Sequence, residues 1–564
     1  MISRASALAK LSSLEQAPVL IIGAGINGIG TFRDLALQGV DVVMVDRADF
    51  CSGTSMASSH MLHGGIRYLE NGEFRLVREA LHERNRLLAN APHLTAPLPT
   101  VIPIYKRFSG VLNAPLKFLG LLDRPSERGA LVIKLGLMLY DGFVRRHNPL
   151  PGHDFFARES ALKKWPELNP EVLYAARYYD GFMPSPERIC MELIGDAERD
   201  HGGAIALNYA PVVGVDKDQV LIETEEGAEI RLSPRIVINA AGPWIDFANR
   251  HLQENTDFIG GTKGSHLILD HPRLRDALAD HEFFFEYFDG RIVLILPYLD
   301  KVMIGTTDIR IDDPDEARCT EDEIDYMLGM VPKVFPAIEV GREHIIFQFS
   351  GVRPLPSAQG KSTGQISRDH QLEILEPEAG RPYAIFNLIG GKWTTFRAFS
   401  EQVSDEVLGR LDRRRRASTA DLAIGGGAGY PESTEKQDEW VEERAIESPM
   451  PAAYIRQLLE RYGTRADRYL AAAETSGDGM LSADPYYSEA EIRTLIQNER
   501  VHHLDDVLLR RTTLAWTGAV SPDLLNRVSE LTGEMLAWTA VQRQSELDRT
   551  IQILQEDHGL LFHM

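Results

Sequence analysis

Cysteine and long apolar runs are both scarce in this chain. Only three cysteines occur among 564 residues, and no two of them have Cys-x-x-Cys spacing. That pattern predicts neither a disulfide framework nor a zinc site, so no metal is expected and a reducing cytoplasm fits. The longest apolar candidate for a membrane span covers about ten residues, 131–140, whereas a crossing helix needs roughly twenty. Residues 1–17 lack the apolar core and cleavage site of a signal peptide.

Positive charge is also in deficit, since 60 Lys and Arg stand against 82 Asp and Glu, for a net charge of -22. This balance argues against general nucleic-acid binding. The exception is the segment 106–146, where eight Lys and Arg face three Asp and Glu among apolar stretches. Such interleaving is typical of segments that lie on an anionic membrane. A buried helix pair with solvated basic ends produces the same pattern, so both interpretations stay open.

A dinucleotide-binding pattern stands near the amino end. The apolar run 19–22 predicts a buried strand, and Gly23, Gly25 and Gly28 predict a tight turn into a helix. A second strand is expected to end just before Asp46, whose carboxylate is suited to ribose hydroxyls. Amide groups at the start of such a helix favour a pyrophosphate. On these residues alone, NAD and FAD fit equally well.

The rest of the chain divides into an α/β part and a helical part. β-rich runs between 211 and 349 predict a meander that returns to the nucleotide sheet, followed by an antiparallel substrate sheet. We therefore expect a Rossmann-like nucleotide-binding domain interleaved with an antiparallel-sheet substrate domain over 18–407. An N-terminal extension over 1–17 precedes it. A linker over 408–438 leads to an all-α cap domain over 439–553, where apolar residues recur at helical spacing.

Several short motifs follow one another in a specific order. They are Gly23-Ala-Gly-Ile-Asn-Gly28, Thr54-Ser-Met-Ala-Ser-Ser59, Leu62-His-Gly-Gly-Ile-Arg-Tyr-Leu-Glu70, Lys263-Gly-Ser-His266, Ile304-Gly-Thr-Thr-Asp308, Ser350-Gly-Val-Arg-Pro-Leu355 and Gly390-Gly-Lys-Trp-Thr-Thr395. Taken together, this series resembles the FAD-dependent glycerol-3-phosphate dehydrogenases over about residues 18–407. A weaker resemblance returns at 498–506, with Arg510 and Arg511.

The resemblance implies a flavoprotein that binds FAD. Such an enzyme oxidises sn-glycerol 3-phosphate to dihydroxyacetone phosphate by hydride transfer to flavin N5, and passes electrons to membrane quinone. It implies peripheral attachment at the cytoplasmic face of the cell membrane, and a homodimer is an option. Three alternatives stay open: an oxidase of the same fold that uses oxygen, a dehydrogenase of another polyol phosphate such as erythritol 4-phosphate, and a flavin-binding regulatory protein without turnover.

Oxidation of an alcohol beside a phosphate needs a base and cations as well as a hydride acceptor. Arg353 carries a guanidinium group, a fork of N–H donors suited to a phosphate or a developing alkoxide. Lys392 follows two glycines at an expected helix start, where positive charge favours a reduced flavin. His266 is the first candidate for the general base, because histidine titrates near neutral pH. A lone histidine is more often structural.

The predicted site extends well beyond these three catalytic candidates. The resemblance adds Arg67, Tyr68 and Arg368 to Arg353 and Lys392 as substrate contacts, although Arg368 beside Asp369 also reads as a structural ion pair. His63 is expected against the flavin, and its covalent attachment stays open. The expected cofactor contacts are Gly23, Gly25, Gly28, Asp46, Thr54, Ser55, Ser58, Ser59, His63, Gly64, Gly65, Val213, Ala241, Gly242, Trp244, Gly391, Lys392, Trp393 and Thr394.

Overall fold

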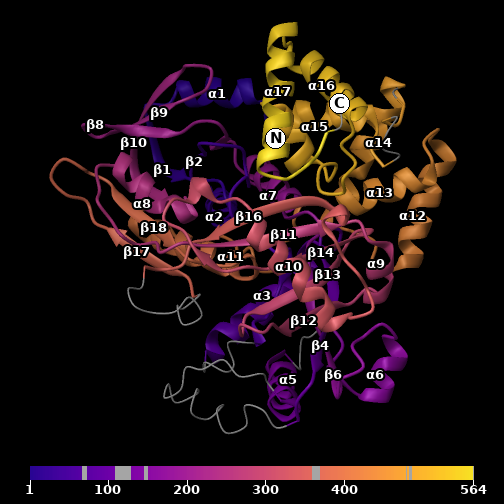
Figure 1. Ribbon diagram of the computed structural model, residues 1–564. Helices are drawn as coiled ribbons and strands as arrows, with labels where there is room; N and C mark the ends of the chain where they lie inside the picture. Colours follow the sequence, from indigo (N-terminus) through magenta and orange to yellow (C-terminus); the bar gives the residue numbers. More distant parts are fainter. Residues whose placement is uncertain are drawn as a thin grey trace.

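The computed structural model describes residues 1–66, 73–107, 129–144, 150–357, 369–477, 479–481 and 486–562. These residues form two β-sheets, with helices packed on them, and a group of helices at the carboxyl end (Figure 1). The predicted fold class is confirmed: a Rossmann-like domain, a largely antiparallel sheet and a C-terminal all-α domain.

The first sheet is the nucleotide-binding one. Neighbouring strands from β18 through β7 run parallel, and β17 is an antiparallel edge. Helices α2 (Ile26–Leu37), α7 (Pro186–Asp200) and α11 (Phe396–Arg410) share one apolar core with the sheet, and α1 (Arg4–Ser12) packs into the other. In order, the strands are β17 (Gln371–Leu375), β18 (Ala384–Ile389), β10 (Glu229–Asn239), β1 (Gln16–Ile22), β2 (Val42–Val45) and β7 (Ala204–Leu207), with β8 (Val212–Asp216) and β9 (Gln219–Glu223) extending from β10.

The predicted strand, glycine turn and helix at the amino end are confirmed as β1 and α2. Gly23 has a φ of +103°, which L side chains rarely adopt. A Cβ at Gly28 would lie 2.0 Å from the Gly23 carbonyl oxygen. The turn therefore depends on glycine at both positions, and it brings the amino end of α2 to the carboxyl edge of the sheet.

The second sheet is antiparallel except where β12 pairs with β4. Helices α6 (Arg158–Lys164), α9 (Pro272–Leu278) and α10 (Glu321–Val334) share an apolar core with it. The predicted strands after residue 262 are all present. In order, the strands are β15 (Ile309–Arg310), β11 (Thr262–Leu269), β14 (Lys301–Gly305), β13 (Ile292–Tyr298), β12 (Glu282–Glu286), β4 (Ala96–Ile104), β6 (Tyr174–Phe182) and β3 (Met61–Leu62), with β16 (Ile345–Arg353) beside β11 and β5 (Asp154–Ala157) beside β6.

The carboxyl-terminal helices pack against the second sheet. Trp516 lies between their core and β16, with its ring 5.0 Å from that of Phe349. The preceding segment, expected to be a linker, is tied to the first sheet's helices: Arg415 Nη1 lies 2.9 Å from Asp34, and the Gly425 amide donates to Asp196. The helices are α12 (Thr434–Glu447), α13 (Ala452–Tyr462), α14 (Ala466–Ser476), α15 (Glu489–Asn498), α16 (Pro522–Leu536) and α17 (Ala540–Glu556), with a π-helical turn over Asp506–Arg511.

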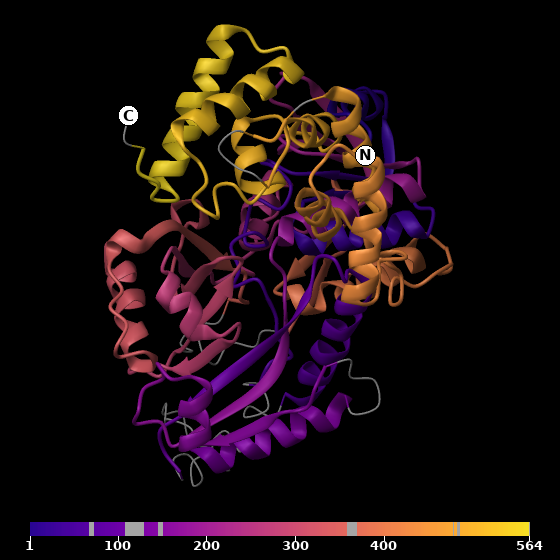
Figure 2. The same cartoon turned by 90° about the vertical axis from the view of Figure 1, so that its right-hand side faces the viewer.

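Helix α5 (Ala130–Val144) lies at the end of the molecule away from these helices (Figure 2). It packs on α3 (Phe74–Asn90) through Ile133, Leu137 and Tyr140. Its other face exposes Leu131, Leu135 and Met138 by 55%, 59% and 57%. Most of the predicted basic segment lies outside the described residues, at 108–128 and 145–149. Within the described ranges, no helix is both long and apolar enough to cross a bilayer.

Candidate active site

A cavity of about 1010 Å³ is lined by residues of both sheets. It begins at the carboxyl ends of β1 and β2, next to α8 (Ile245–His251), and reaches β11 and β16. A volume of this size is ample for a dinucleotide together with a small substrate. The predicted residues that line it are Gly23, Gly25, Asp46, Thr54, Ser55, Ser58, Ser59, His63, Gly65, Ala241, Gly242, Trp244, His266, Arg353, Gly391, Lys392, Trp393 and Thr394.

Other predicted residues lie elsewhere. Gly28 is absent from the lining because it packs α2 against the turn, and the Gly64 amide points to Asp180 at 3.0 Å. Val213 is 40% exposed, and its neighbour Val212 lines the cavity, at a point where the pairing of β8 with β9 shifts register between Val212 and Gly214. Arg67, Tyr68 and Arg368 lie outside the described residues.

The nucleotide end of the cavity is built around Asp46. Its carboxylate accepts hydrogen bonds from the amides of Ala24 at 2.6 Å and Ala48 at 2.9 Å. Burial raises the pKa of Asp46 to about 6, against these two hydrogen bonds. Added hydroxyl donors would favour its ionised form, so this carboxylate fits the ribose of an adenine dinucleotide.

Side chains of the 54–59 loop brace this end of the cavity as well as lining it. Ser55 Oγ accepts a hydrogen bond from the Ile26 amide at 2.9 Å, so it binds a backbone amide at the amino end of α2. Trp393 Nε1 donates to the Ser55 carbonyl at 2.8 Å, and Thr54 Oγ1 donates to the Val352 carbonyl at 2.6 Å. The loop is thus fastened to α2, β16 and the start of α11, and its backbone has little freedom to move.

Arg353 stands at the far end of the cavity on β16. Its Nη1 lies 3.2 Å from Asp308 Oδ1, and its Nη2 donates to Thr306 Oγ1 at 3.1 Å. A Cβ at Gly264 on β11 would lie 2.2 Å from Nη2, so only glycine leaves room for the guanidinium there. The Thr306 to Asp308 turn therefore orients the fork, a role that the sequence motif did not reveal.

His266 is buried on β11 with its ring stacked on Phe349 at 4.9 Å. Its Nε2 lies 2.8 Å from Ser59 Oγ. Burial first of all, and then the nearby charge of Arg353, lower the pKa of His266 to about 3. The imidazole is therefore neutral at physiological pH, contrary to the expectation that it titrates near neutrality.

Lys392 lines the cavity at the start of a short 3₁₀ turn, Trp393–Thr395, which runs directly into α11. The two preceding residues, Gly390 and Gly391, have φ values of +73° and +92°. Asn27 of α2 donates to the Gly390 carbonyl at 3.2 Å. The predicted glycine pair and helix start are present, and they place a cation at a helix amino end beside the nucleotide turn.

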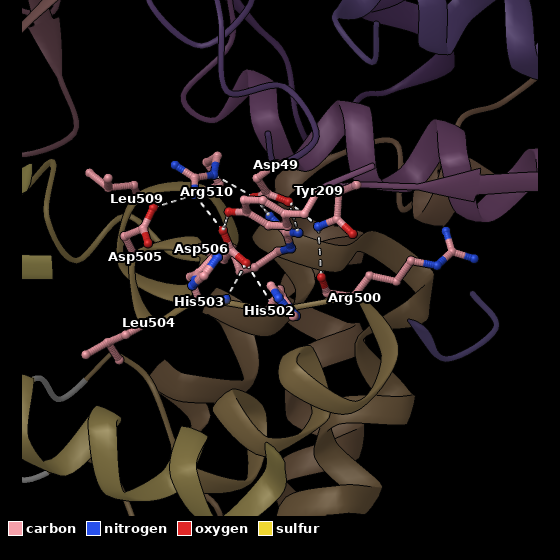
Figure 3. A network of polar contacts seen from close by, with 12 residues as sticks. Asp49, Tyr209, Arg500, His502, His503, Leu504, Asp505, Asp506, Leu509 and Arg510 are labelled. Carbon is pink, nitrogen blue, oxygen red and sulfur yellow. Dashed lines mark hydrogen bonds and ion pairs between the residues drawn. The ribbon is translucent and has the colours of Figure 1, made fainter. Parts of the chain in front are cut away.

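The carboxyl-terminal helices also reach the cavity, through a network shown in Figure 3. Asp49, three residues after Asp46, is buried and accepts hydrogen bonds from Arg510 Nε at 2.5 Å and Arg511 Nη1 at 2.7 Å. Arg510 also reaches Asp506 Oδ1 at 2.6 Å. Sequence reasoning missed these side chains as part of the site, although the pair Arg510-Arg511 was their visible signal. The residues of this region that line the cavity are Asp49, Tyr209, Asp505, Arg510 and Arg549.

Comparison with known proteins agrees with this arrangement. The FAD dependent oxidoreductase family model matches residues 18–387, and the model for the C-terminal domain of alpha-glycerophosphate oxidase matches residues 417–543. A glycerol-3-phosphate dehydrogenase of Synechocystis sp. is 34% identical over 568 residues, which cover 95% of each chain. A D-erythritol 1-phosphate dehydrogenase of Brucella abortus is 31% identical over 511 residues, 88% of this chain and 94% of that one.

Among solved structures, a glycerol-3-phosphate dehydrogenase from Bacillus halodurans complexed with FAD has the same fold, with a TM-score of 0.76. It is 23% identical, and the match covers 100% of this chain and 99% of the other. The expected cofactor, FAD, and the expected oxidoreductase class are confirmed. The cavity and the Asp46 carboxylate at its nucleotide end fit that cofactor. The chain belongs to the FAD-dependent glycerol-3-phosphate dehydrogenase family.

Proposed function

We propose that this chain oxidises sn-glycerol 3-phosphate to dihydroxyacetone phosphate and passes the electrons to a membrane quinone. The observation that carries the proposal is that the Arg353 guanidinium, the neutral His266 imidazole and Lys392 line one cavity. A cationic guanidinium group suits a phosphate, and the negative charge of a phosphate on Arg353 would offset the effect of that cation on His266 and raise the affinity of the imidazole for a hydroxyl proton. The name of the Synechocystis relative supports this choice of substrate.

Each of the three side chains has its own role in the proposed reaction. Arg353 binds the substrate phosphate, with its fork held by Thr306 and Asp308. His266 takes up the hydroxyl proton at Nε2, the atom now in contact with Ser59. Lys392 adds a second cation at a helix amino end, which favours anionic groups in the cavity. The cavity residues at the β1–α2 turn would hold FAD, which would supply the hydride acceptor.

The deciding experiment is anaerobic stopped-flow reduction of the holoenzyme. We expect glycerol 3-phosphate to bleach the flavin absorbance rapidly, and Arg353→Ala to lower kcat/KM by about 100-fold or more. Arg231→Ala, on an exposed edge of β10, is the matched control and should behave as wild type. A wild-type flavin that stays oxidised with glycerol 3-phosphate would exclude this substrate.

A second substrate is favoured by one observation, the 31% identity to the D-erythritol 1-phosphate dehydrogenase. The same cations would hold the phosphate of a longer polyol. The reduction experiment therefore includes D-erythritol 1-phosphate and erythritol 4-phosphate. Faster bleaching by either one than by glycerol 3-phosphate would assign the chain to that substrate. Reoxidation of the reduced enzyme by a soluble quinone, compared with oxygen, then separates a dehydrogenase from an oxidase.

Helix α5 supports the membrane part of the proposal. Its exposed face of Leu131, Leu135 and Met138 is of the kind that lies in a headgroup layer, and Lys134 stands exposed beside it. We expect the protein to sediment with anionic phosphatidylglycerol vesicles, and less so in high salt. Leu135→Asp with Met138→Asp should abolish sedimentation, whereas Val541→Asp, at a still more exposed site on α17, should not. Attachment at the cytoplasmic face and a homodimer stay predictions.

A further inference from the structure

A cluster of two histidines and a carboxylate lies outside the cavity. The Nε2 atoms of His502 and His503 are 3.0 Å and 2.8 Å from the same oxygen, Glu225 Oε2. The three side chains are 24%, 12% and 45% exposed in that order. We propose that Glu225, His502 and His503 form a binding site for a zinc-type divalent cation.

The histidine pair is held in place by two acidic side chains, the buried Asp506 and the partly buried Glu546. Asp506 Oδ2 accepts hydrogen bonds from the backbone amides of His502 at 2.8 Å and His503 at 3.0 Å, as Figure 3 shows. His503 Nδ1 lies 2.9 Å from Glu546 Oε1 on α17. A carboxylate on the far nitrogen of an imidazole fixes the ring and raises its basicity, as it does for histidines that bind metals. The backbone and one ring are therefore positioned before any cation binds.

The donor set selects the class of cation. Two imidazole nitrogens and one carboxylate oxygen suit zinc, which takes three protein ligands and leaves a fourth position for water. Tetrahedral ligand atoms at about 2.0–2.1 Å from zinc lie about 3.3 Å apart, so the two distances from the imidazole nitrogens to Glu225 Oε2, 3.0 Å and 2.8 Å, need to lengthen by only a few tenths of an ångström. All three ligand atoms lie within 4.8 Å of one another. Glu225 is on an exposed turn between β9 and β10 and has room for that shift.

Neighbouring positive charge does not occupy the site. Arg4 pairs with Glu226 at 2.7 Å, and Arg549 pairs with Asp505. A bound cation would join the β9–β10 hairpin of the first sheet to the loop that precedes the π-helical turn. It would act as a structural clip between the nucleotide-binding domain and the carboxyl-terminal helices, apart from the flavin chemistry.

The test is equilibrium dialysis of chelator-treated holoenzyme against zinc, followed by metal analysis and thermal unfolding. We expect one zinc per chain and a higher Tm with zinc, because a ligand that binds only the folded state stabilises it. Glu225→Gln and His503→Gln should each weaken zinc binding at least tenfold and remove the Tm shift. Glu546→Gln should weaken it by about 10–100-fold through the orientation of His503.

His201→Gln is the matched control, because His201 also pairs with a carboxylate, Asp41 at 2.7 Å, but belongs to no such cluster of three among the described residues. It should bind zinc as wild type does. If His503→Gln fails to fold, Glu225→Gln decides alone, since its site is an exposed turn. Zinc affinity that is equal in wild type and Glu225→Gln, or no zinc bound by wild type, would overturn the proposal.

Discussion

At the scale of single residues, burial decides which titratable groups carry charge. Glu282 on β12 is fully buried, and Thr100 Oγ1 donates to its Oε2 at 2.6 Å. Burial raises the pKa of Glu282 to about 8, in spite of that hydrogen bond. His266 shows the opposite sign for the same reason, since burial disfavours its charged form. Both side chains therefore stay largely neutral at pH 7.

The raised pKa of Glu282 makes stability depend on pH. Between about pH 4.5 and pH 8 the folded chain holds a proton that the unfolded chain releases, so this group lowers the free energy of unfolding as pH rises. Glu282→Gln removes this dependence of the free energy of unfolding on pH. We expect the variant to be more stable than wild type by roughly 1–3 kcal/mol at pH 8 and about equal at pH 5. Urea unfolding at both pH values measures this, and a variant that is less stable at pH 8 would contradict it.

His266 should act on the rate more than on folding. If its Nε2 accepts the hydroxyl proton, His266→Asn lowers kcat by about 100-fold or more. Ser59→Ala keeps the imidazole and removes only its partner at 2.8 Å, so it should lower kcat less than tenfold. Steady-state kinetics with flavin content checked by absorbance compare the two. Equal losses in both variants would assign His266 a positioning role.

At the scale of elements, the β1–α2 turn depends on close backbone approach. Adding a methyl group at Gly28 would place it 2.0 Å from the Gly23 carbonyl, which belongs to the backbone and cannot rotate away. The same addition at Gly214 on β8 meets no atom within 4 Å. Gly28 on α2 and Gly214 on β8 thus differ entirely in how closely an added Cβ would approach other atoms.

We expect Gly28→Ala to destabilise the protein by about 1–3 kcal/mol and to release FAD during purification, because α2 must shift from the turn. Gly214→Ala is the matched control. It should change the stability by less than about 0.5 kcal/mol and keep the normal flavin content. Thermal unfolding and flavin absorbance measure the pair. Full flavin content and unchanged Tm in Gly28→Ala would show that the turn tolerates a side chain.

At the scale of the whole molecule, the helical domain holds the loop that follows β2. Burial alone would raise the pKa of Asp49, but the guanidinium groups of Arg511 and Arg510 hold it well below its usual range. Asp506 accepts hydrogen bonds from Arg510 and from Tyr209, at 2.6 Å and 2.5 Å. This network links the loop that carries Asp46 to residues more than four hundred positions later.

Breaking this network should lower the free energy of unfolding far more than breaking a surface ion pair does. Asp49→Asn leaves two buried guanidinium groups without their shared carboxylate, so we expect a loss of about 3–5 kcal/mol and weaker FAD retention. Asp467→Asn, in an exposed pair with Arg444, should cost less than about 1 kcal/mol.

Because the pKa of Asp49 is depressed, its stabilisation is present above about pH 4 and is lost as pH falls further. Urea unfolding of the three proteins at pH 7 and pH 3 tests both statements.

Much of the fold could be predicted because it rests on local patterns. The apolar run before Gly23, the glycine spacing and the pair Gly390-Gly391 act on neighbouring backbone atoms, so the strand, turn and helix starts followed from them. The direction in which a side chain points was harder to predict. The strand over 212–215 was expected, but the exposed Val213 was chosen where Val212 reaches the cavity, since the register shift between Val212 and Gly214 arises only when the strand pairs with β9.

The sequence by itself determined the nucleotide turn, the family and the types of side chain available for the chemistry, because these depend on residues close together in the chain. Only the tertiary structure decided that His266 is neutral, that Asp308 orients Arg353, and that Arg510 and Arg511 hold Asp49. Those properties arise from burial and from contacts between distant segments, and both exist only once the two sheets and the carboxyl-terminal helices have packed together.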